Sequence, residues 1–300
     1  MREVSSITFG MAALMGILLL LSCTAGKKFQ LPEVLREVSG VAPDGKGGWY
    51  WHNDSGHPPV LYQTDREGKL LDSIRPTQAV NRDWEDLAAD PSGYLYIADV
   101  GNNSNKRRDL TIYRSNAATG QLDSMQILYQ RQKVYPPDDR RLWQFDAEAL
   151  VYAGKELWLF TKSFPTGGHP YAYVYRFDFE PGTASILPID SIYLGKYLAT
   201  GAALHPDGQT LALLTYRLHR LFGKLPYLTT RINTFSMRDH SLQPLGKRQI
   251  HHVLTWRQFE AVEWWDAQRL LIASERLRRF RQTAKVVKAP GVRHRSIPAK

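Results

Sequence analysis

A pattern of two short runs recurs five times along the chain and constrains the fold more than any other feature of the sequence. The first runs start at Ser39, Glu85, Glu148, Gly201 and Glu260, and each second run, apolar or aromatic, begins ten residues after its start. Turn-forming residues separate the two runs, as in Asp44-Gly45 and Pro206-Asp207-Gly208. Each repeat is therefore predicted to be a β-hairpin.

Hairpins that repeat at intervals of roughly 50 residues predict a β-propeller, because one blade is a small antiparallel sheet of about that length. Five repeats predict five blades, and a six-bladed ring with a degenerate blade is the alternative. A β-sandwich would also give many short strands, but not one hairpin repeated five times in register. We expect residues 29–38 to add a strand to the last blade and so to close the ring.

The N-terminus has the pattern of an export signal. Arg2 precedes an apolar stretch from Ile7 to Leu21, which is short for a bilayer-spanning helix of roughly 20 residues. The stretch ends in Leu20-Leu21-Ser22-Cys23, which resembles a bacterial lipobox. We predict a signal peptide over 1–22 and lipidation of Cys23, with a cleaved secretory peptide or an uncleaved anchor as alternatives. This places the protein in the bacterial cell envelope, anchored to a membrane, most simply the outer membrane.

The formal net charge of +10 comes from the C-terminus. Residues 276–300 contain nine Lys or Arg and no Asp or Glu, so the other residues hold 30 basic and 29 acidic side chains (39 − 9 against 29). A nucleic-acid-binding fold needs a basic face, so we expect no nucleic-acid partner. The predicted domains are a lipidated tether over 23–35, a propeller over 36–281 and a basic tail over 282–300, either solvated or in contact with anionic lipid.

Residues 89–103, Ala-Asp-Pro-Ser-Gly-Tyr-Leu-Tyr-Ile-Ala-Asp-Val-Gly-Asn-Asn, resemble the first hairpin of an NHL-type propeller blade. Together with Ser39-Gly40-Val41, His52-Asn53-Asp54-Ser55-Gly56 and Asp83-Trp84-Glu85-Asp86-Leu87, they resemble exported bacterial propellers of the phytase-like and esterase-like groups. The resemblance implies a six-bladed propeller. For the phytase-like relatives it implies hydrolysis of phosphate esters with calcium.

Acidic residues are predicted to gather at one mouth of the central channel. In each hairpin the first residue should face the residue fourteen positions later. The facing pairs are Ser39/Asn53, Glu85/Asp99, Glu148/Lys162, Gly201/Thr215 and Glu260/Ser274, with Asp54 and Glu275 one position beyond. Several close carboxylates need a cation or must bind protons. We therefore predict a hard divalent ion, calcium first, held by Glu85, Asp99, Glu148, Glu260, Asp54 and Glu275.

The other predicted ligand-binding side chains are Asn53, Trp84, Lys162 and Arg217. A purely structural role is the alternative for the glutamates, because propeller repeats often use one polar residue to bond backbone N–H groups of the next blade. Trp49, Trp51 and Trp158 are expected to pack in or between blades.

Three functions follow from these features. The first is a lipid-anchored propeller that binds a ligand, a metal ion or a protein partner at an acidic mouth. The second is a calcium-dependent phosphoesterase or esterase-like hydrolase with Glu85 or Glu148 as general base. The third is a structural component of the envelope. The sequence does not distinguish an enzyme from a binding protein.

Overall fold

The computed structural model describes residues 26–162, 167–221, 225–238, 241–250, 257–276 and 280–292. Cys23 and the predicted signal peptide lie outside these ranges, so lipidation stays a prediction. Within the described residues, no helix is long and apolar enough to cross a membrane.

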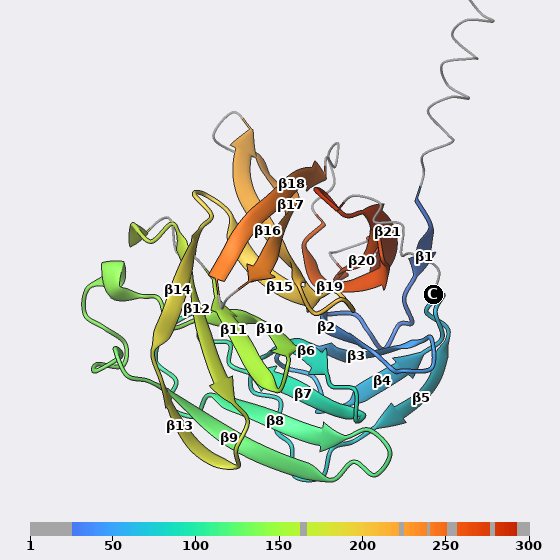
Figure 1. The fold of residues 1–300 in the computed structure, drawn as a ribbon, viewed down its shortest axis with the longest axis horizontal. Coiled ribbons are helices and arrows are strands. Elements are labelled where there is room, and N and C mark those ends of the chain that lie inside the picture. Colours follow the sequence, from blue (N-terminus) through green and yellow to red (C-terminus); the bar gives the residue numbers. More distant parts are fainter. Residues whose placement is uncertain are drawn as a thin grey trace, which may run out of the picture.

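Five antiparallel sheets form the five blades of a β-propeller (Figure 1). Blade 1 contains β2 (Val38–Pro43), β3 (Trp49–Asn53), β4 (Leu61–Thr64) and β5 (Leu70–Ile74). Blade 2 contains β6 (Trp84–Ala89), β7 (Tyr94–Asp99), β8 (Thr111–Asn116) and β9 (Leu122–Tyr129). Blade 3 contains β10 (Ala147–Ala153), β11 (Glu156–Thr161), β12 (Tyr171–Asp178) and β14 (Pro188–Tyr193), and a short 3-10 helix, Arg140–Leu142, precedes it.

Blade 4 contains β15 (Leu198–Leu204), β16 (Thr210–Leu221), β17 (Leu225–Arg238) and β18 (Ser241–Ile250). Blade 5 contains β19 (Phe259–Asp266), β20 (Arg269–Ser274), β21 (Thr283–Lys288) and β1 (Lys28–Gln30). One strand does not belong to the blade formed by its neighbours in the sequence. β13 (Gly182–Ile186) pairs in parallel with β9 and so extends blade 2 to five strands.

The first strand of each predicted hairpin is the innermost strand of its blade. β2, β6, β10, β15 and β19 contact one another in this order, and β19 contacts β2 again, so they form a closed ring. The predicted five-bladed propeller is thereby confirmed, and the described strands contain no sixth blade.

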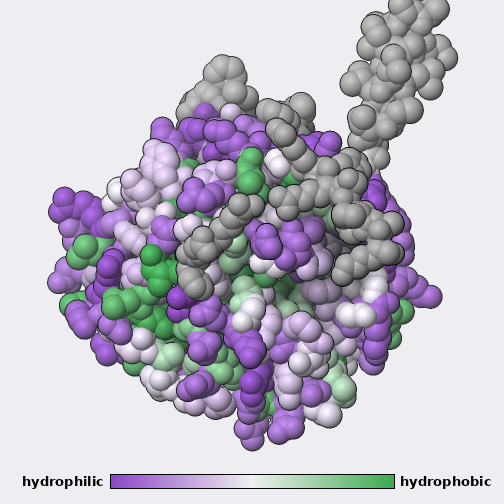
Figure 2. Space-filling model, in the orientation of Figure 1, coloured by the Kyte–Doolittle hydropathy of each residue, from purple (hydrophilic) through white to green (hydrophobic). Residues whose placement is uncertain are grey.

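The apolar core lies between the blades rather than at the centre. Five clusters of buried side chains each join two neighbouring blades. Trp49 and Trp51 pack between blades 5 and 1, and Trp158 packs between blades 3 and 4, as expected. A buried aromatic side chain removes roughly 150–250 Å² from water, so these interfaces account for much of the stability. Hydrophilic residues cover most of the periphery of the face in Figure 2.

The first and the last described strands meet in blade 5, where β1 pairs with β21 and β21 pairs with β20 (Figure 1). As predicted, an N-terminal segment adds a strand to the last blade, although this strand is Lys28–Gln30. Two predicted boundaries were wrong. The tether 23–35 contains β1 and the buried Leu31 and Leu35, and the tail 282–300 contains β21 with the buried Ala284 and Val286. Alternating apolar side chains in the last segment bury one face of a strand despite its lysines.

Candidate functional site

Near its start, at an equivalent position, each innermost strand has a residue that bulges out of the ladder with the second strand. The register shifts at Ser39, Glu85, Glu148, Thr200 and Glu260. A bulge turns its side chain away from the regular alternation, and bulges are common beside binding sites. The three glutamates do occupy equivalent positions, as the repeat predicted, but they are bulge residues and not members of facing pairs.

The observed register corrects the predicted pairs. The residues that face Asn53, Asp99, Thr215 and Ser274 are those just before the bulges, Val38, Trp84, Ala199 and Phe259. In blade 3, the equivalent residue on the second strand is Thr161, which faces Ala147. Lys162 thus lies one residue beyond the strand, as Asp54 and Glu275 do in their blades, whereas Tyr216, at the equivalent position of blade 4, lies within the longer strand β16.

The bulge residues divide into two chemical kinds. The Ser39 hydroxyl donates to the backbone carbonyl of Glu85 in the next blade at 2.6 Å, and the Thr200 hydroxyl donates to that of Phe259 at 3.2 Å. Among the described contacts, no carboxylate of Glu85, Glu148 or Glu260 bonds the backbone of a neighbouring blade. These two hydroxyls therefore link neighbouring blades through backbone carbonyl groups, and the glutamates do not have the N–H-bonding role proposed as their alternative.

Asp86, the neighbour of Glu85, has the backbone-bonding role. Its fully buried carboxylate accepts from the N–H groups of Leu87 and Leu150, each at 2.9 Å, and Ala202 at 3.1 Å. These groups belong to blades 2, 3 and 4, so Asp86 fastens three innermost strands together.

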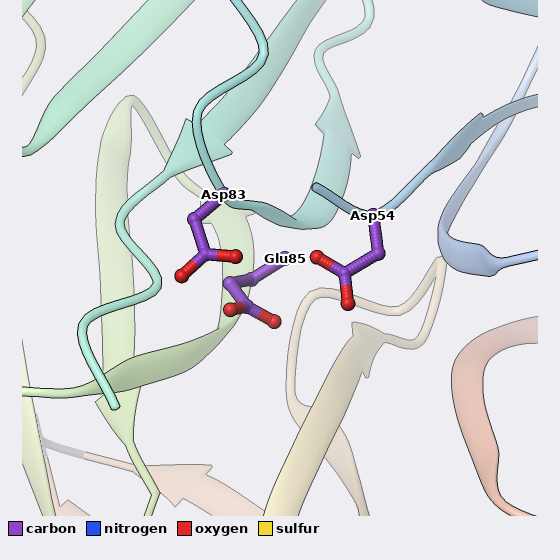
Figure 3. A group of neighbouring side chains, drawn as sticks. All are labelled: Asp54, Asp83 and Glu85. Carbon is purple, nitrogen blue, oxygen red and sulfur yellow. The ribbon is translucent and has the colours of Figure 1, made fainter. Parts of the chain in front are cut away.

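Glu85 lies at the centre of the candidate metal site. It shares one group of carboxylates with Asp54 and Asp83, whose oxygens lie within 4.8 Å of one another (Figure 3). It shares a second such group with Asp146 and Glu148. Only 6% of the Glu85 surface is exposed, and its carboxylate makes no hydrogen bond or ion pair with any described residue. The cluster could hold an ion, because calcium prefers several carboxylate and carbonyl oxygens.

Gly101 allows these carboxylates to lie so close to the backbone. A Cβ atom at this position would overlap a carboxylate oxygen of Glu85 and one of Asp83. The loop after β7 therefore needs glycine here for a close approach, not for a left-handed conformation.

Among the described residues, the ammonium group of Lys162 faces the acidic residues. Lys162 Nζ lies 2.6 Å from Glu148 Oε1, and both side chains are largely buried. Burial opposes the charged form of Lys162, but Glu148, together with Asp146 and Glu85, outweighs it and raises the pKa of Lys162 well above its usual range. Tyr216 lies in the same field, and burial raises its pKa to about 12.

Four acidic residues around the mouth, Glu85, Glu260, Glu275 and Asp54, bind protons more tightly than usual. Burial and the neighbouring Glu148 and Asp54 raise the pKa of Glu85 well above its usual range. Burial and carboxylates nearby raise the pKa of Glu260 to about 8 and that of Glu275 to about 7. Burial also raises the pKa of Asp54 to about 6, although it accepts from the Ser55 N–H.

These shifts predict that the metal-free protein loses stability as the pH rises. The pKa values of these carboxyl groups are higher in the folded state than in the unfolded state, where they are about 4. At a pH between the two values the folded state binds more protons than the unfolded state, so the free energy of unfolding falls as the pH rises through this range. We expect the melting temperature in EDTA to fall from pH 6.5 to 8.5, a range in which His52, whose pKa burial lowers to about 4, stays neutral. A melting temperature that is constant or rises over this range in EDTA would contradict the account.

Four predicted site residues do not line the cluster. Asp99 is neutralised by Arg107, with Nη2 and Oδ1 2.9 Å apart, and it accepts from the N–H of Asp83. Asn53 binds the backbone of Val34 and Glu37 through its amide group, which is a structural contact.

Trp84 and Arg217 are the other two predicted site residues that lie outside the cluster. Trp84 is fully buried, packs edge-on against His52 at 5.4 Å, and donates its indole N–H to Val80. Arg217 lines a groove between blades 3 and 4, which also contains Tyr193 and Tyr197. The long strand β16 carries Arg217 beyond the mouth.

Glu260 and Glu275 lie near the cluster but outside its two groups of carboxylates. Glu260 accepts a hydrogen bond from Gln258. Glu275 and Asp54 raise the proton affinity of Glu260, and Glu37 and Asp54 raise that of Glu275. Two members of the cluster were missed, Asp83 and Asp146. Each lies two residues before a bulge glutamate, and this Asp-x-Glu spacing in blades 2 and 3 was the signal that could have found them.

No protein-family model and no curated protein sequence matches this chain. Several solved structures align with most of it at low identity. A gluconolactonase from Xanthomonas campestris is 14% identical, with 88% of this chain and 99% of the other covered and a TM-score of 0.42. A putative gluconolactonase is 10% identical (90% and 95% covered, TM-score 0.47). A streptogramin B lyase is also 10% identical (87% and 97% covered, TM-score 0.44). The five-bladed assignment rests on the five sheets and their closed ring.

Proposed function

We propose that this protein is an exported, lipid-anchored propeller whose acidic mouth binds a divalent cation, calcium first, and through it a ligand with oxygen donors. One observation carries the proposal. The Glu85 carboxylate is buried in two groups of carboxylates and has no hydrogen-bond or ion-pair partner among the described residues. A buried charge without a partner is unfavourable by several kcal/mol, and a bound cation removes that penalty.

The geometry assigns different roles to the two groups of carboxylates. No salt bridge joins Asp54, Asp83 or Glu85 to a described basic residue. Lys162 is paired with Glu148 and acts on Glu85 and Asp54 only through its electric field, so these three carboxylates are the proposed ligands of the ion. Asp146 and Glu148 share Lys162, which already compensates part of their charge. The ion would be partly exposed at the mouth, since Asp54 and Asp83 are only half-buried, and so could accept an oxygen ligand from solution.

Calcium is expected to stabilise the protein strongly. A ligand present at 100 times its Kd adds about 2.7 kcal/mol, which for a domain of this size raises the melting temperature by about 5–10 °C. Thermal denaturation at pH 8 in EDTA, in CaCl2 and in MgCl2 measures this effect. If neither salt raises the melting temperature above that in EDTA, the proposal is wrong.

A hydrolase is the second candidate, because Glu85 has the properties of a general base beside a metal ion. It is buried, its pKa is raised, and it lies within one group of carboxylates with Asp54 and Asp83, which in a hydrolase would hold the ion and leave Glu85 as the base. Lys162 could stabilise a developing negative charge on the substrate. Turnover of a phosphomonoester or a lactone that requires both calcium and Glu85 would support this function. Calcium binding without turnover would contradict the hydrolase and support the binding protein.

The proposed membrane anchor depends on the thiol of Cys23. Cys23→Ser is expected to leave an unprocessed precursor without lipid, because the lipid is attached to the sulfur. Metabolic labelling with a fatty acid in a bacterial host tests this outcome, with the wild-type protein as the positive control. Labelling that persists in Cys23→Ser would show that the protein is not anchored in this way.

A further inference from the structure

The channel has a second end, which Asp86 separates from the acidic mouth. Its carboxylate links the innermost strands of blades 2, 3 and 4 through three backbone N–H groups. Asp86 has no exposed surface, so the strands are closed around it. A ligand at the far end would therefore meet a different set of residues from a ligand at the acidic mouth.

A cavity of about 780 Å³ opens at this far end. It lies where the innermost strands of the blades end, and the hairpin turns at 44–45, 90–93, 154–155 and 205–208 surround its entrance. The volume lies within the range of pockets that bind small organic molecules, about 300–1,000 Å³.

The cavity wall is mostly apolar and built from small side chains. Ala88, Ala202 and Ala203 line it together with Leu150 and Val151. Alanine at three positions of the innermost strands leaves the room that larger side chains would fill. Such a wall favours the apolar part of a ligand.

One carboxylate, Glu263, lies in this wall. It accepts a single hydrogen bond, at 2.6 Å, from the backbone N–H of Trp264, the next residue in the chain. No salt bridge joins it to a described basic residue, and burial raises its pKa to about 8. A carboxylate in an apolar cavity is stabilised in its charged form when a cation binds beside it.

The other charged groups near Glu263 or in the cavity lining are already engaged or lie at the entrance. Asp86 is saturated by backbone N–H groups, and Asp44 and Asp90 hold their own turns. His205 pairs with Asp207. Lys155, which is exposed on the turn between β10 and β11, is the remaining basic residue in the lining.

We propose that this cavity is a second binding site, for a small organic ammonium ion with an apolar body, whose charge is neutralised by Glu263. The alanine-lined wall would contact the apolar body, and the ammonium group would donate hydrogen bonds to the carboxylate. This proposal is independent of the proposed function, because the two sites lie at opposite ends of the channel.

Calorimetric titration with n-hexylammonium chloride, and with hexanol and hexanoate as matched probes, tests the site in wild-type protein. We expect saturable binding of the ammonium ion, with an affinity at least tenfold above that of hexanol and no binding of hexanoate. The affinity should rise from pH 7 to pH 9 as Glu263 ionises, because an alkylammonium with a pKa near the 10.4 of lysine stays charged. No saturable binding, or equal affinities for ammonium and alcohol, overturns the proposal.

Glu263→Gln should lower the affinity for hexylammonium at least tenfold and remove its pH dependence. Glu180→Gln makes the same change of charge on the exposed surface, outside the cavity, and should leave the affinity unchanged. Because the glutamine has nearly the shape of a protonated glutamate, we expect Glu263→Gln to fold with an unchanged or higher melting temperature. Unaltered hexylammonium binding in Glu263→Gln contradicts the site, whereas unaltered calcium stabilisation in that variant shows that the acidic mouth is intact.

Discussion

Deletion of residues 283–300 is expected to unfold the propeller. It removes β21, which pairs with β20 over six residues and with β1 over three. Ala284 and Val286 contribute to the core between blades 5 and 1 and are almost inaccessible to solvent. Without β21, β1 has no partner, the N-terminal strand no longer completes blade 5, and the edge of β20 and this core become exposed. We expect the free energy lost with this pairing and this core to exceed the roughly 5–15 kcal/mol by which domains are stable.

Circular dichroism and size-exclusion chromatography of the deletion variant measure this effect. A graded comparison uses two single substitutions. Val286→Ala, in the buried strand, should lower the stability by about 1–3 kcal/mol, and Val34→Ala, at an exposed position, should lower it by less than about 0.5 kcal/mol. A deletion variant that melts within about 8 °C of the full chain would show that β21 is a dispensable tail.

Substitution of Lys162 by methionine is expected to destabilise the calcium-free protein by about 3–5 kcal/mol, the range measured when one partner of a buried ion pair is removed. Lys162 and Glu148 are 14% and 4% exposed, so solvent screens their interaction poorly. Methionine nearly keeps the volume of the side chain but leaves the carboxylates of Glu148, Asp146 and Glu85 without a cation. Denaturant unfolding at pH 8 in EDTA measures the loss.

Two conditions should restore stability to Lys162→Met. Acidification to about pH 6 allows the orphaned carboxylates to bind protons, since burial raises the pKa of Glu148 well above its usual range. Calcium supplies the missing positive charge. The matched control is Arg141→Met, which breaks the exposed pair of Arg141 with Asp139 and should change stability by less than about 1 kcal/mol. If Lys162→Met is as stable as the wild type in EDTA at pH 8, Lys162 does not compensate the acidic mouth.

The sequence repeat was sufficient to predict the five blades, their innermost strands and the equivalent positions of Glu85, Glu148 and Glu260 in those strands. It could not predict the bulges, because a bulge adds one residue to a strand without changing the pattern of apolar positions. Two blades therefore differ by one residue from the register that the repeat predicted. Blade 3 closes its hairpin with a two-residue turn at Gly154 and Lys155, both at positive φ, which moves Thr161 into the position assigned to Lys162. In blade 4 the bulge is at Thr200 and not at Gly201.

The partners of the acidic residues depend on loops that a hairpin repeat does not describe. Arg107 reaches Asp99 from the loop between β7 and β8, so the carboxylate predicted as a metal ligand has its own cation. Asp83 and Asp146 reach the mouth from the segments that enter β6 and β10. The chemical character of the mouth was therefore predictable, but the residues that share one ion were not.

Isothermal titration of the metal-free protein with calcium, at pH 8, tests the central claim most directly. The account predicts one saturable site in the wild type and at least a tenfold loss of affinity in Glu85→Gln, which keeps the shape of the side chain and removes its charge. Glu180→Gln, an exposed change of the same charge, should bind calcium as the wild type does. Absence of calcium binding to the wild type, or equal affinity in Glu85→Gln, would contradict a cation site at the acidic mouth.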